Sequence, residues 1–378
     1  MRIGLVVAGG VDRSGRHHVI PALLWLIERL ARAHDIFVYV LRYHERPCTY
    51  PLLGATVRDL GRPAGASQQY RALVATLRRD GPFDLLHAYW ALPAGLAAGL
   101  AGRRLGVPVV LTCDSGEFAS RPAIGYGQQR HLRHRIAVAV ATRLARRVTV
   151  CTAFQADLAR RHGLDPLIIP LGVPASVFSP HALSPAAGPP WRLIHVANLN
   201  PVKDQLTLLT ALHRLVGIER AIHLDVVGLD TLGGAIQQRA RDLDLTGHVT
   251  FHGVLTTDDL VRVYRRAHLA VLSSQHEAAG VVTLEAAACG VPTVGTAVGY
   301  VHDWAPQAAL AVPVADPVAL ADGILHLLQH PSHRVQLAHA ARARALARDA
   351  DWTAGAFARL YAELADAVTS QGRPPAPE

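Results

Sequence analysis

Short apolar runs alternate with longer helical patterns along the whole chain, and this alternation restricts the fold more than any other feature. Ten runs are typical of strands: 3–8, 36–41, 84–88, 108–112 and 148–151, then 191–197, 222–228, 248–253, 269–274 and 291–295. Their continuous Val, Ile and Leu content predicts parallel strands that are buried on both faces. The fold class is therefore α/β, with two doubly wound parallel sheets.

The two series of strands meet at a proline-rich segment, which indicates a linker at 179–190. We expect an N-terminal Rossmann-like domain at 1–178 and a C-terminal one at 191–350. An amphipathic helix at 351–370 should pack back on the N-terminal domain, and 371–378 should be a flexible tail. Two doubly wound domains in tandem predict a cleft between them, lined by loops at the carboxyl ends of the strands.

Composition excludes several classes of protein. Half the residues are apolar and 18% are charged, which is typical of a globular protein. No run reaches the roughly 20 apolar residues of a membrane span, and the first residues read as a strand rather than a signal peptide. The four cysteines form no CxxC pair, so we expect reduced thiols in a cytoplasmic protein.

The net charge of +9 is uneven: residues 1–180 carry 23 Arg against 11 Asp and Glu, whereas the rest is slightly acidic. This asymmetry favours an anionic partner: a phosphorylated substrate, an acidic membrane surface or nucleic acid. Aromatic residues do not interleave with the basic ones as in base-stacking proteins, so nucleic acid is the weakest of the three. The alternative is a solvated arginine-rich face.

The segment "SSQHEAAGVVTLEAAACGVPTV" carries the strongest chemical signal. A strand ends in a polar loop, and a helix should begin at about Val281, with Glu277 in the loop and Glu285 in the helix. First-turn N–H groups of a helix are unsatisfied and form an anion site. That site would comprise Gly280, Val281, Val282 and Thr283. The alternative is that both glutamates are ordinary solvated or dipole-stabilising residues.

Lys203, in "VANLNPVKDQLTLL", is the only lysine in the chain. It follows a predicted strand and an Asn-Pro turn and precedes a helix, so it should lie on the rim of the cleft. Its three donors on a flexible stem suit a diphosphate. A surface lysine retained by chance is the alternative.

The blocks around Lys203, Glu277 and Glu285 resemble the retaining glycosyltransferases of family 4, the group 1 glycosyl transferases, which have the GT-B fold with two Rossmann-like domains around a central cleft. The resemblance implies a nucleotide-sugar donor, a hydroxyl acceptor, and transfer with retention and without a metal. Lys203 would hold the diphosphate, Glu277 the donor sugar and Glu285 the ribose. The same resemblance assigns Gly253 and Val254 to the base and the helix amides after Gly280 to the diphosphate. Gly9 and Gly10 would let the N-terminal loop approach the phosphate or the acceptor, and Asn198 is a further candidate in the donor site.

The chain departs from the family pattern at several positions. Ala197-Asn198 replaces a common Gly-Arg, which leaves Lys203 with more of the diphosphate charge. Asp114 occupies the place of a histidine near the reaction centre, followed by Glu117. This carboxylate pair would bind the acceptor or act as base, unless Asp114 only caps a turn. His87 and the arginines of 125–135 should shape the acceptor side.

Three alternatives remain open. The same fold could carry out hydrolysis or epimerisation of a nucleotide sugar, or act as a non-catalytic nucleotide-sugar-binding scaffold. A dinucleotide dehydrogenase is more distant, because "GGVDRSG" is not a Gly-x-Gly-x-x-Gly fingerprint. We expect no cofactor and no metal site. The donor nucleotide is open among UDP, GDP and ADP. The acceptor is open among glycans, lipids and small molecules, including anionic and lipid-linked ones, and peripheral contact with an anionic membrane is compatible with the charge.

Overall fold

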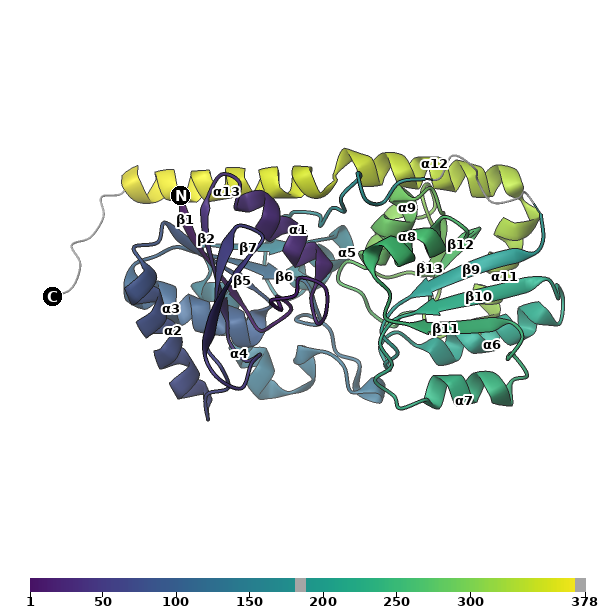
Figure 1. Ribbon diagram of the computed structural model, residues 1–378, viewed down its shortest axis with the longest axis horizontal. Helices are drawn as coiled ribbons and strands as arrows, with labels where there is room; N and C mark the ends of the chain where they lie inside the picture. The colour runs from purple at the N-terminus through teal and green to yellow at the C-terminus, as the bar shows by residue number, and fades with distance from the viewer. Residues whose placement is uncertain (181–187, 371–378) are drawn as a thin grey trace. The chain divides into compact units, whose positions relative to one another are not determined.

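Each of the two series of strands builds its own sheet in the computed structural model, which describes residues 1–180 and 188–370 (Figure 1). Contacts divide the chain into unit 1, Met1–Leu171 with Ala350–Glu378, and unit 2, Gly172–Asp349. The division falls before the expected domain end at 178. Most of the predicted linker and the whole predicted tail lie outside the described residues.

Among the described residues, unit 1 contains an eight-stranded sheet in the order β3-β4-β2-β1-β5-β6-β7-β8. Its strands are β1 (Arg2–Val7), β2 (Asp35–Val40), β3 (Cys48–Leu52), β4 (Ala55–Asp59), β5 (Leu85–Tyr89), β6 (Val109–Cys113), β7 (Arg147–Val150) and β8 (Leu167–Ile168). All pairings are parallel except that of β3 with β4. The predicted parallel sheet is confirmed, with β3, β4 and β8 added.

The β3–β4 hairpin turns at Leu53 and Gly54, which both have positive φ angles, 50° and 83°. Positive φ at both central residues of a two-residue turn matches the right-handed twist of the flanking strands. The hairpin register sets Cys48 directly opposite Asp59.

Helices flank the unit 1 sheet: α1 (Pro21–Leu30), α2 (Ala66–Asp80), α3 (Leu96–Leu105), α4 (Leu132–Leu144), α5 (Ala153–Arg160) and α13 (Ala350–Ser370), with short helical turns at Ala91–Gly95, Pro122–Ile124 and Gln128–Arg130. Helix α13 lies beside α1 (Figure 1), where Arg29 Nε is 2.9 Å from Asp351 Oδ1. Further along, Thr353 Oγ1 donates to the Pro170 carbonyl oxygen at 2.7 Å. The C-terminal helix thus belongs to the N-terminal sheet.

In the described residues of unit 2, a six-stranded parallel sheet has the order β11-β10-β9-β12-β13-β14. Its strands are β9 (Trp191–Val196), β10 (Ile222–Val227), β11 (Val249–Gly253), β12 (Leu269–Leu272), β13 (Thr293–Thr296) and β14 (Leu310–Val312). By chain order this is 3-2-1-4-5-6, so the connection reverses direction between β9 and β12. Ligands of open α/β sheets bind at such a reversal.

The helices of unit 2 are α6 (Gln205–Val216), α7 (Ala235–Asp242), α8 (Thr257–Tyr264), α9 (Val282–Ala288), α10 (Gly299–Trp304), α11 (Pro317–Gln329) and α12 (Pro331–Ala347). Side-chain caps define several starts: Asp204 accepts from the Thr207 amide before α6, and Asp316 accepts from two amides before α11. Within 1–180 and 188–370, none of the helices combines the length and apolar character needed to cross a bilayer.

Candidate active site

Lys203 and Glu277 lie on loops that leave two neighbouring strands of the unit 2 sheet. Strand β9 ends at Val196 before the Lys203 loop, and β12 ends at Leu272 before the Glu277 loop. Because β9 and β12 are paired and parallel, both loops leave the same edge of the sheet. The two residues therefore lie at the topological switch point of this sheet.

Three hydrogen bonds tie the two loops together. The backbone N–H of Gln275 donates to the Val202 carbonyl oxygen at 2.8 Å. The Ser273 hydroxyl donates to the Lys203 carbonyl oxygen at 2.8 Å, and the Gln275 side-chain amide donates to Asp204 Oδ2 at 3.2 Å. These bonds fix the backbone that carries the lysine.

A cation and an anion meet across the two loops, where Lys203 Nζ lies 2.5 Å from Glu277 Oε1. The Ser274 hydroxyl donates to the same oxygen at 2.6 Å. The side chains are 24% exposed for the lysine and 10% for the glutamate. Removing one partner of a pair so poorly solvated leaves an uncompensated charge and costs more than breaking a surface pair.

His195 lies in β9, the strand that leads into the Lys203 loop, and is fully buried. Its Nδ1 is 2.9 Å from the Val271 carbonyl oxygen and its Nε2 is 3.2 Å from the Gln205 side-chain nitrogen. These partners define a neutral ring with the proton on Nδ1, donating to the carbonyl. Burial lowers the pKa of His195 to about 4, and the charge of Lys203 acts in the same direction. The histidine therefore adds no positive charge to the lysine at neutral pH.

Two glycines with positive φ shape the turn before α9. Gly280 lies in the turn itself, with φ 76°, and Gly299 at the start of α10, with φ 53°, packs against the turn. A Cβ on Gly299 would lie 2.3 Å from the Ala279 carbonyl oxygen, which accepts a 2.8 Å hydrogen bond from the Tyr300 amide. The Thr283 amide donates to the Gly280 carbonyl oxygen at 2.9 Å. Of the four expected anion-binding amides, that of Thr283 is thus used within the chain, which corrects the expectation that it is unsatisfied.

Glu285, one turn into α9, is buried and accepts a 3.0 Å hydrogen bond from the Tyr264 hydroxyl of α8. Burial raises the pKa of Glu285 to about 7, and the bond from Tyr264 opposes this shift. The carboxyl is therefore held by a neighbouring helix rather than by Lys203. Its role at the nucleotide ribose stays a prediction.

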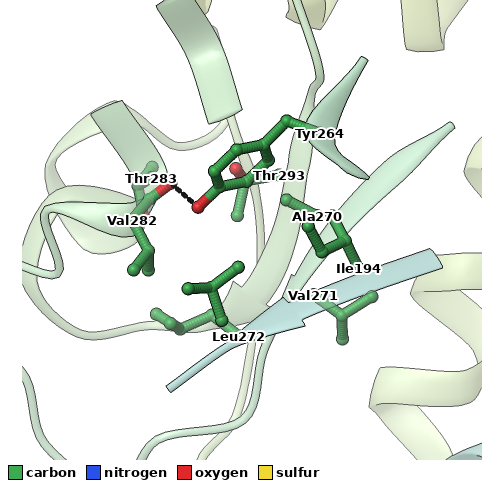
Figure 2. Close-up of a pocket in the computed structure, with 9 residues that line it drawn as sticks. Ile194, Tyr264, Ala270, Val271, Leu272, Val282, Thr283 and Thr293 are labelled. Atoms are coloured by element: carbon green, nitrogen blue, oxygen red, sulfur yellow. Dashed lines mark hydrogen bonds between the residues drawn. The ribbon is translucent and has the colours of Figure 1, made fainter. Parts of the chain in front are cut away.

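A small cavity lies between α9 and the sheet (Figure 2). Its volume is about 10 Å³, and its walls include the Tyr264 ring, whose hydroxyl is 3.4 Å from the Val282 carbonyl oxygen. The hydroxyls of Thr283 and Thr293 are buried there, and within the described part of the chain they have no hydrogen-bond partner. A space of this size accommodates one water-sized group and excludes a nucleotide.

The other donor residues predicted in unit 2 lie at the same edge of the sheet. Asn198 Oδ1 accepts from the Leu229 amide at 3.1 Å, so its side chain joins the loops after β9 and β10. Gly253 ends β11 with φ 65° and open space where a Cβ would be, and Val254 beside it is 62% exposed. An exposed apolar side chain beside an open glycine is suited to contact with a planar base.

In unit 1, Gly9 and Gly10 follow β1 and are partly exposed. Gly10 has φ 84°, and a Cβ there would lie 2.6 Å from Ile20 Cδ1. A Cβ on Gly9 would lie 3.5 Å from Tyr43 Cδ2, an ordinary contact. The tight turn therefore requires glycine at Gly10, whereas Gly9 leaves the loop surface open.

Asp114 follows β6 and is partly exposed, and its Oδ1 accepts a bond from Cys151 Sγ at 3.3 Å. Glu117 differs from the expectation of a carboxylate pair, because it is fully buried. The amides of Ser115 and Ala91 donate to it at 2.8 and 3.3 Å, and burial raises the pKa of Glu117 to about 7. Glu117 ties two loops together and is not available to an acceptor, which leaves Asp114 as the candidate.

His87 was expected on the acceptor side, and this expectation is wrong. The ring is fully buried in β5, with Nδ1 2.6 Å from the Tyr361 hydroxyl and Nε2 2.7 Å from Thr112 Oγ1. Burial lowers the pKa of His87 to about 3. The histidine joins α13 to the sheet and contributes to packing rather than to a substrate surface.

Sequence reasoning missed three residues that support the site: Ser274, Tyr264 and His195. Ser274 lies in the same loop as Glu277. The two residues are three positions apart, and this short spacing was the sequence signal that could have predicted their hydrogen bond. Tyr264 reaches Glu285 from another helix, and His195 lies within a strand. Neither has a local pattern that distinguishes it from a core residue.

Family models match both halves of the chain. A "Glycosyl transferase 4-like domain" matches residues 19–172, and "Glycosyl transferases group 1" matches residues 182–344. The D-inositol 3-phosphate glycosyltransferase of Salinispora arenicola is 30% identical over 328 residues, which cover 78% of this chain and 72% of the relative. The enzyme of the same name from Mycobacteroides abscessus is 28% identical over 361 residues, which cover 88% and 77%.

Solved structures share the fold at low identity. Sucrose-phosphate synthase from Thermosynechococcus elongatus superposes with a TM-score of 0.83 at 20% identity, over 97% of this chain and 100% of that one. Anabaena Alr3699/HepE in complex with UDP and glucose gives 0.75 at 18% identity, over 96% and 99%.

The two doubly wound units, matched by glycosyl transferase models in both halves, identify a glycosyltransferase of the GT-B class. The matches over both units then place it more closely: the chain belongs to the group 1 glycosyl transferases, glycosyltransferase family 4.

Proposed function

We propose that this enzyme transfers a sugar from a UDP-sugar to a hydroxyl of an anionic polyol, with retention of anomeric configuration and without a metal on the diphosphate. The observation that carries the proposal is the 2.5 Å pair of Lys203 Nζ and Glu277 Oε1 at the switch point of the unit 2 sheet. An ammonium fixed at this position supplies positive charge to a diphosphate, which a divalent cation supplies in other enzymes.

The geometry of the pair suggests separate roles for Lys203 and Glu277. Lys203 Nζ has three donors, so it can keep Glu277 and still donate to phosphate oxygens. The bonds from Lys203 and Ser274 both fall on Oε1 of Glu277, and Oε2 is the oxygen that we assign to a sugar hydroxyl. As the sugar–phosphate bond breaks, negative charge grows on the departing UDP, and a fixed ammonium stabilises that charge more than the ground state.

The donor and acceptor follow from different observations. Alr3699/HepE, which shares the fold, was solved with UDP-glucose, and this supports a uridine nucleotide against Gly253 and Val254. The relatives are named D-inositol 3-phosphate glycosyltransferases, and 23 arginines lie in residues 1–180, which supports a phosphorylated polyol. Asp114 is the residue that we assign to an acceptor hydroxyl.

Peripheral contact with an anionic membrane is a separate part of the proposal, and helix α4 supports it. Leu132, Ile136 and Val140 lie four residues apart on one stripe and are 67%, 56% and 37% exposed. From Phe118 to Ala156 the chain has seven arginines and no acidic residue. An exposed apolar stripe among cations is typical of an interfacial helix. Vesicle flotation should show binding to anionic and not to neutral vesicles, and Ile136→Asp should abolish it; equal binding to both kinds would contradict this part.

The transfer reaction is tested with purified protein, UDP-glucose or UDP-N-acetylglucosamine, and D-inositol 3-phosphate or unphosphorylated inositol as acceptor. We expect acceptor-dependent UDP release, an α-glycoside by the anomeric proton coupling in NMR, and no acceleration by Mg²⁺ or Mn²⁺. UDP release at the same rate with and without acceptor would indicate a hydrolase. Donor binding without turnover on any acceptor would support the scaffold alternative.

A further inference from the structure

A cluster of three different metal-ligand types lies in unit 1, at the end of the β3–β4 hairpin. Cys48 at the start of β3 stands opposite Asp59 at the end of β4, and His44 comes from the loop before β3. Within 1–180 and 188–370 this is the one group of three such side chains whose ligand atoms all lie within 4.8 Å of one another. Two of its members are fixed by strand pairing.

The distances are close to those of a tetrahedral zinc site. Zinc–ligand bonds of about 2.0 Å for nitrogen and oxygen and about 2.3 Å for sulfur set ligand atoms roughly 3.3–3.6 Å apart. His44 Nδ1 lies 3.7 Å from Cys48 Sγ and 2.7 Å from Asp59 Oδ2. The sulfur is therefore near its required distance from the histidine and within 4.8 Å of the aspartate oxygen, and the hydrogen-bonded histidine and aspartate would separate by about 0.6 Å to admit the ion.

The surroundings of the cluster also match a metal site. His44 Nε2 faces Asp12 Oδ2 at 3.9 Å, longer than a hydrogen bond, so a short approach would give the second ring nitrogen the carboxylate partner that metal-bound histidines usually have. Asp59 is held by the Gly61 amide at 2.8 Å on Oδ1. The Arg13 guanidinium lies 4.0 Å from Cys48 Sγ and, being on an exposed side chain, can move away from an incoming cation.

We propose that His44, Cys48 and Asp59 form a Zn²⁺ site with an open fourth position. Thiolate and imidazole ligands select zinc over Mg²⁺ and Ca²⁺, which take oxygen ligands. The site adjoins the loop after β1, because Tyr43 donates to Asp12 at 3.3 Å and Tyr50 donates to the Val11 carbonyl oxygen at 2.8 Å. Zinc there would brace the loop that follows Gly9 and Gly10. It lies in a different unit from Lys203, so this proposal does not depend on the transfer mechanism.

The first test uses untagged, metal-free protein titrated with Co²⁺ and with Zn²⁺ against a chromophoric chelator. We expect one zinc per chain and a thiolate-to-cobalt charge-transfer band. Cys48→Ser should remove the band and weaken zinc binding at least about 100-fold. The matched control is His333→Ala, since His326, His330 and His333 form a histidine cluster that lies in unit 2. It should leave the band unchanged.

A second measurement needs no variant, because Cys48 is partly exposed whereas Cys113, Cys151 and Cys289 are buried. Alkylation of the native protein should modify Cys48, located by peptide mass mapping. Zinc at about 100 times its Kd should slow that reaction about 100-fold, in proportion to the free site. No cobalt band, a band that persists in Cys48→Ser, or alkylation at the same rate with and without zinc would overturn the proposal.

Discussion

The two units have the same kind of sheet but carry different chemistry at its carboxyl edge. In unit 2 the loops after β9 and β12 bring Lys203 and Glu277 to 2.5 Å. In unit 1 the loop after β6 carries Asp114, which pairs with a thiol, and Glu117, which is buried among backbone amides. Two doubly wound sheets thus present different groups at this edge: a fixed cation in unit 2 and a partly exposed carboxylate in unit 1. The difference fits a donor with a charged leaving group in unit 2 and a hydroxyl acceptor in unit 1.

The largest expected effect comes from removing the cation. Lys203→Ala should lower kcat/KM about 10²–10³-fold, the usual scale for a lost charge-stabilising donor. Lys203→Arg should also be damaging, because a planar guanidinium cannot reproduce the compact ammonium against Glu277. Steady-state kinetics with saturating acceptor measure both.

The matched control for the lysine is Arg262→Ala, which removes an equal charge from an exposed position on α8. It should change the rate less than about 2-fold, since exposed ion pairs contribute little. Full activity of Lys203→Ala would refute the role of the charge pair and remove the contrast between the units.

The carboxylate of unit 1 should give the next largest effect. Asp114→Asn should lower kcat/KM for the acceptor about 10–10²-fold, the scale of one hydrogen bond to a charged group. The slow hydrolysis of donor in the absence of acceptor should be unchanged, because the donor is assigned to unit 2. An equal loss of both activities would mean that Asp114 acts on the donor or on the fold, and the proposed division between units would be wrong.

The alternation of apolar runs and helical patterns predicted the parallel strands that both units share. The ten strand runs are all present, because a doubly wound sheet buries continuous Val, Ile and Leu segments that differ from the amphipathic helices between them. The β3–β4 hairpin was missed because its strands are short and partly exposed and contain Pro51. Its signal was Gly54 between two alternating segments.

The site was predictable where chemistry follows directly from a loop position. Lys203 and Glu277 each stand just after a strand, so topology alone brings them together. Residues that act through tertiary contacts were not predictable: His87 looked like a cleft residue until Tyr361, far along the chain, proved to be its partner. The same holds for Cys48 and Asp59, whose proximity depends on the missed hairpin.

Backbone strain offers a third comparison between units. Gly299→Ala should destabilise unit 2 by about 2 kcal/mol or more, because φ is 53° and the new Cβ would lie 2.3 Å from the Ala279 carbonyl oxygen. Gly106 in unit 1 also has a left-handed backbone conformation, with φ 67°, but its Cβ position is surrounded by open space. Gly106→Ala should therefore lower the free energy of unfolding by only about 1 kcal/mol. Thermal unfolding measures both, and equal costs would show that the contact with Ala279 relaxes.

The last comparison concerns pH and the two buried glutamates, one in each unit. The pKa of Glu285 is raised by burial to about 7 from an ordinary 4.5, so between these values the folded state binds more protons than the unfolded state. The free energy of unfolding therefore falls as pH rises through this window, by at most about 1.4 kcal/mol per pH unit. Glu285→Gln should flatten this slope and raise stability at pH 8, because the neutral amide oxygen can still accept from Tyr264.

Glu117 has the same raised pKa, about 7, but it accepts from backbone amides, among them those of Ser115 and Ala91, so its substitution should not behave in the same way. In Glu117→Gln one carboxylate oxygen becomes an NH₂ group facing a donor, which leaves a buried amide without its acceptor at a cost of about 1–3 kcal/mol. Urea unfolding at pH 5, 6, 7 and 8 distinguishes the variants: Glu285→Gln should gain stability at high pH and Glu117→Gln should lose it. Identical profiles would mean that the groups around the two carboxyls, a tyrosine hydroxyl in unit 2 and backbone amides in unit 1, do not determine how their protonation changes stability.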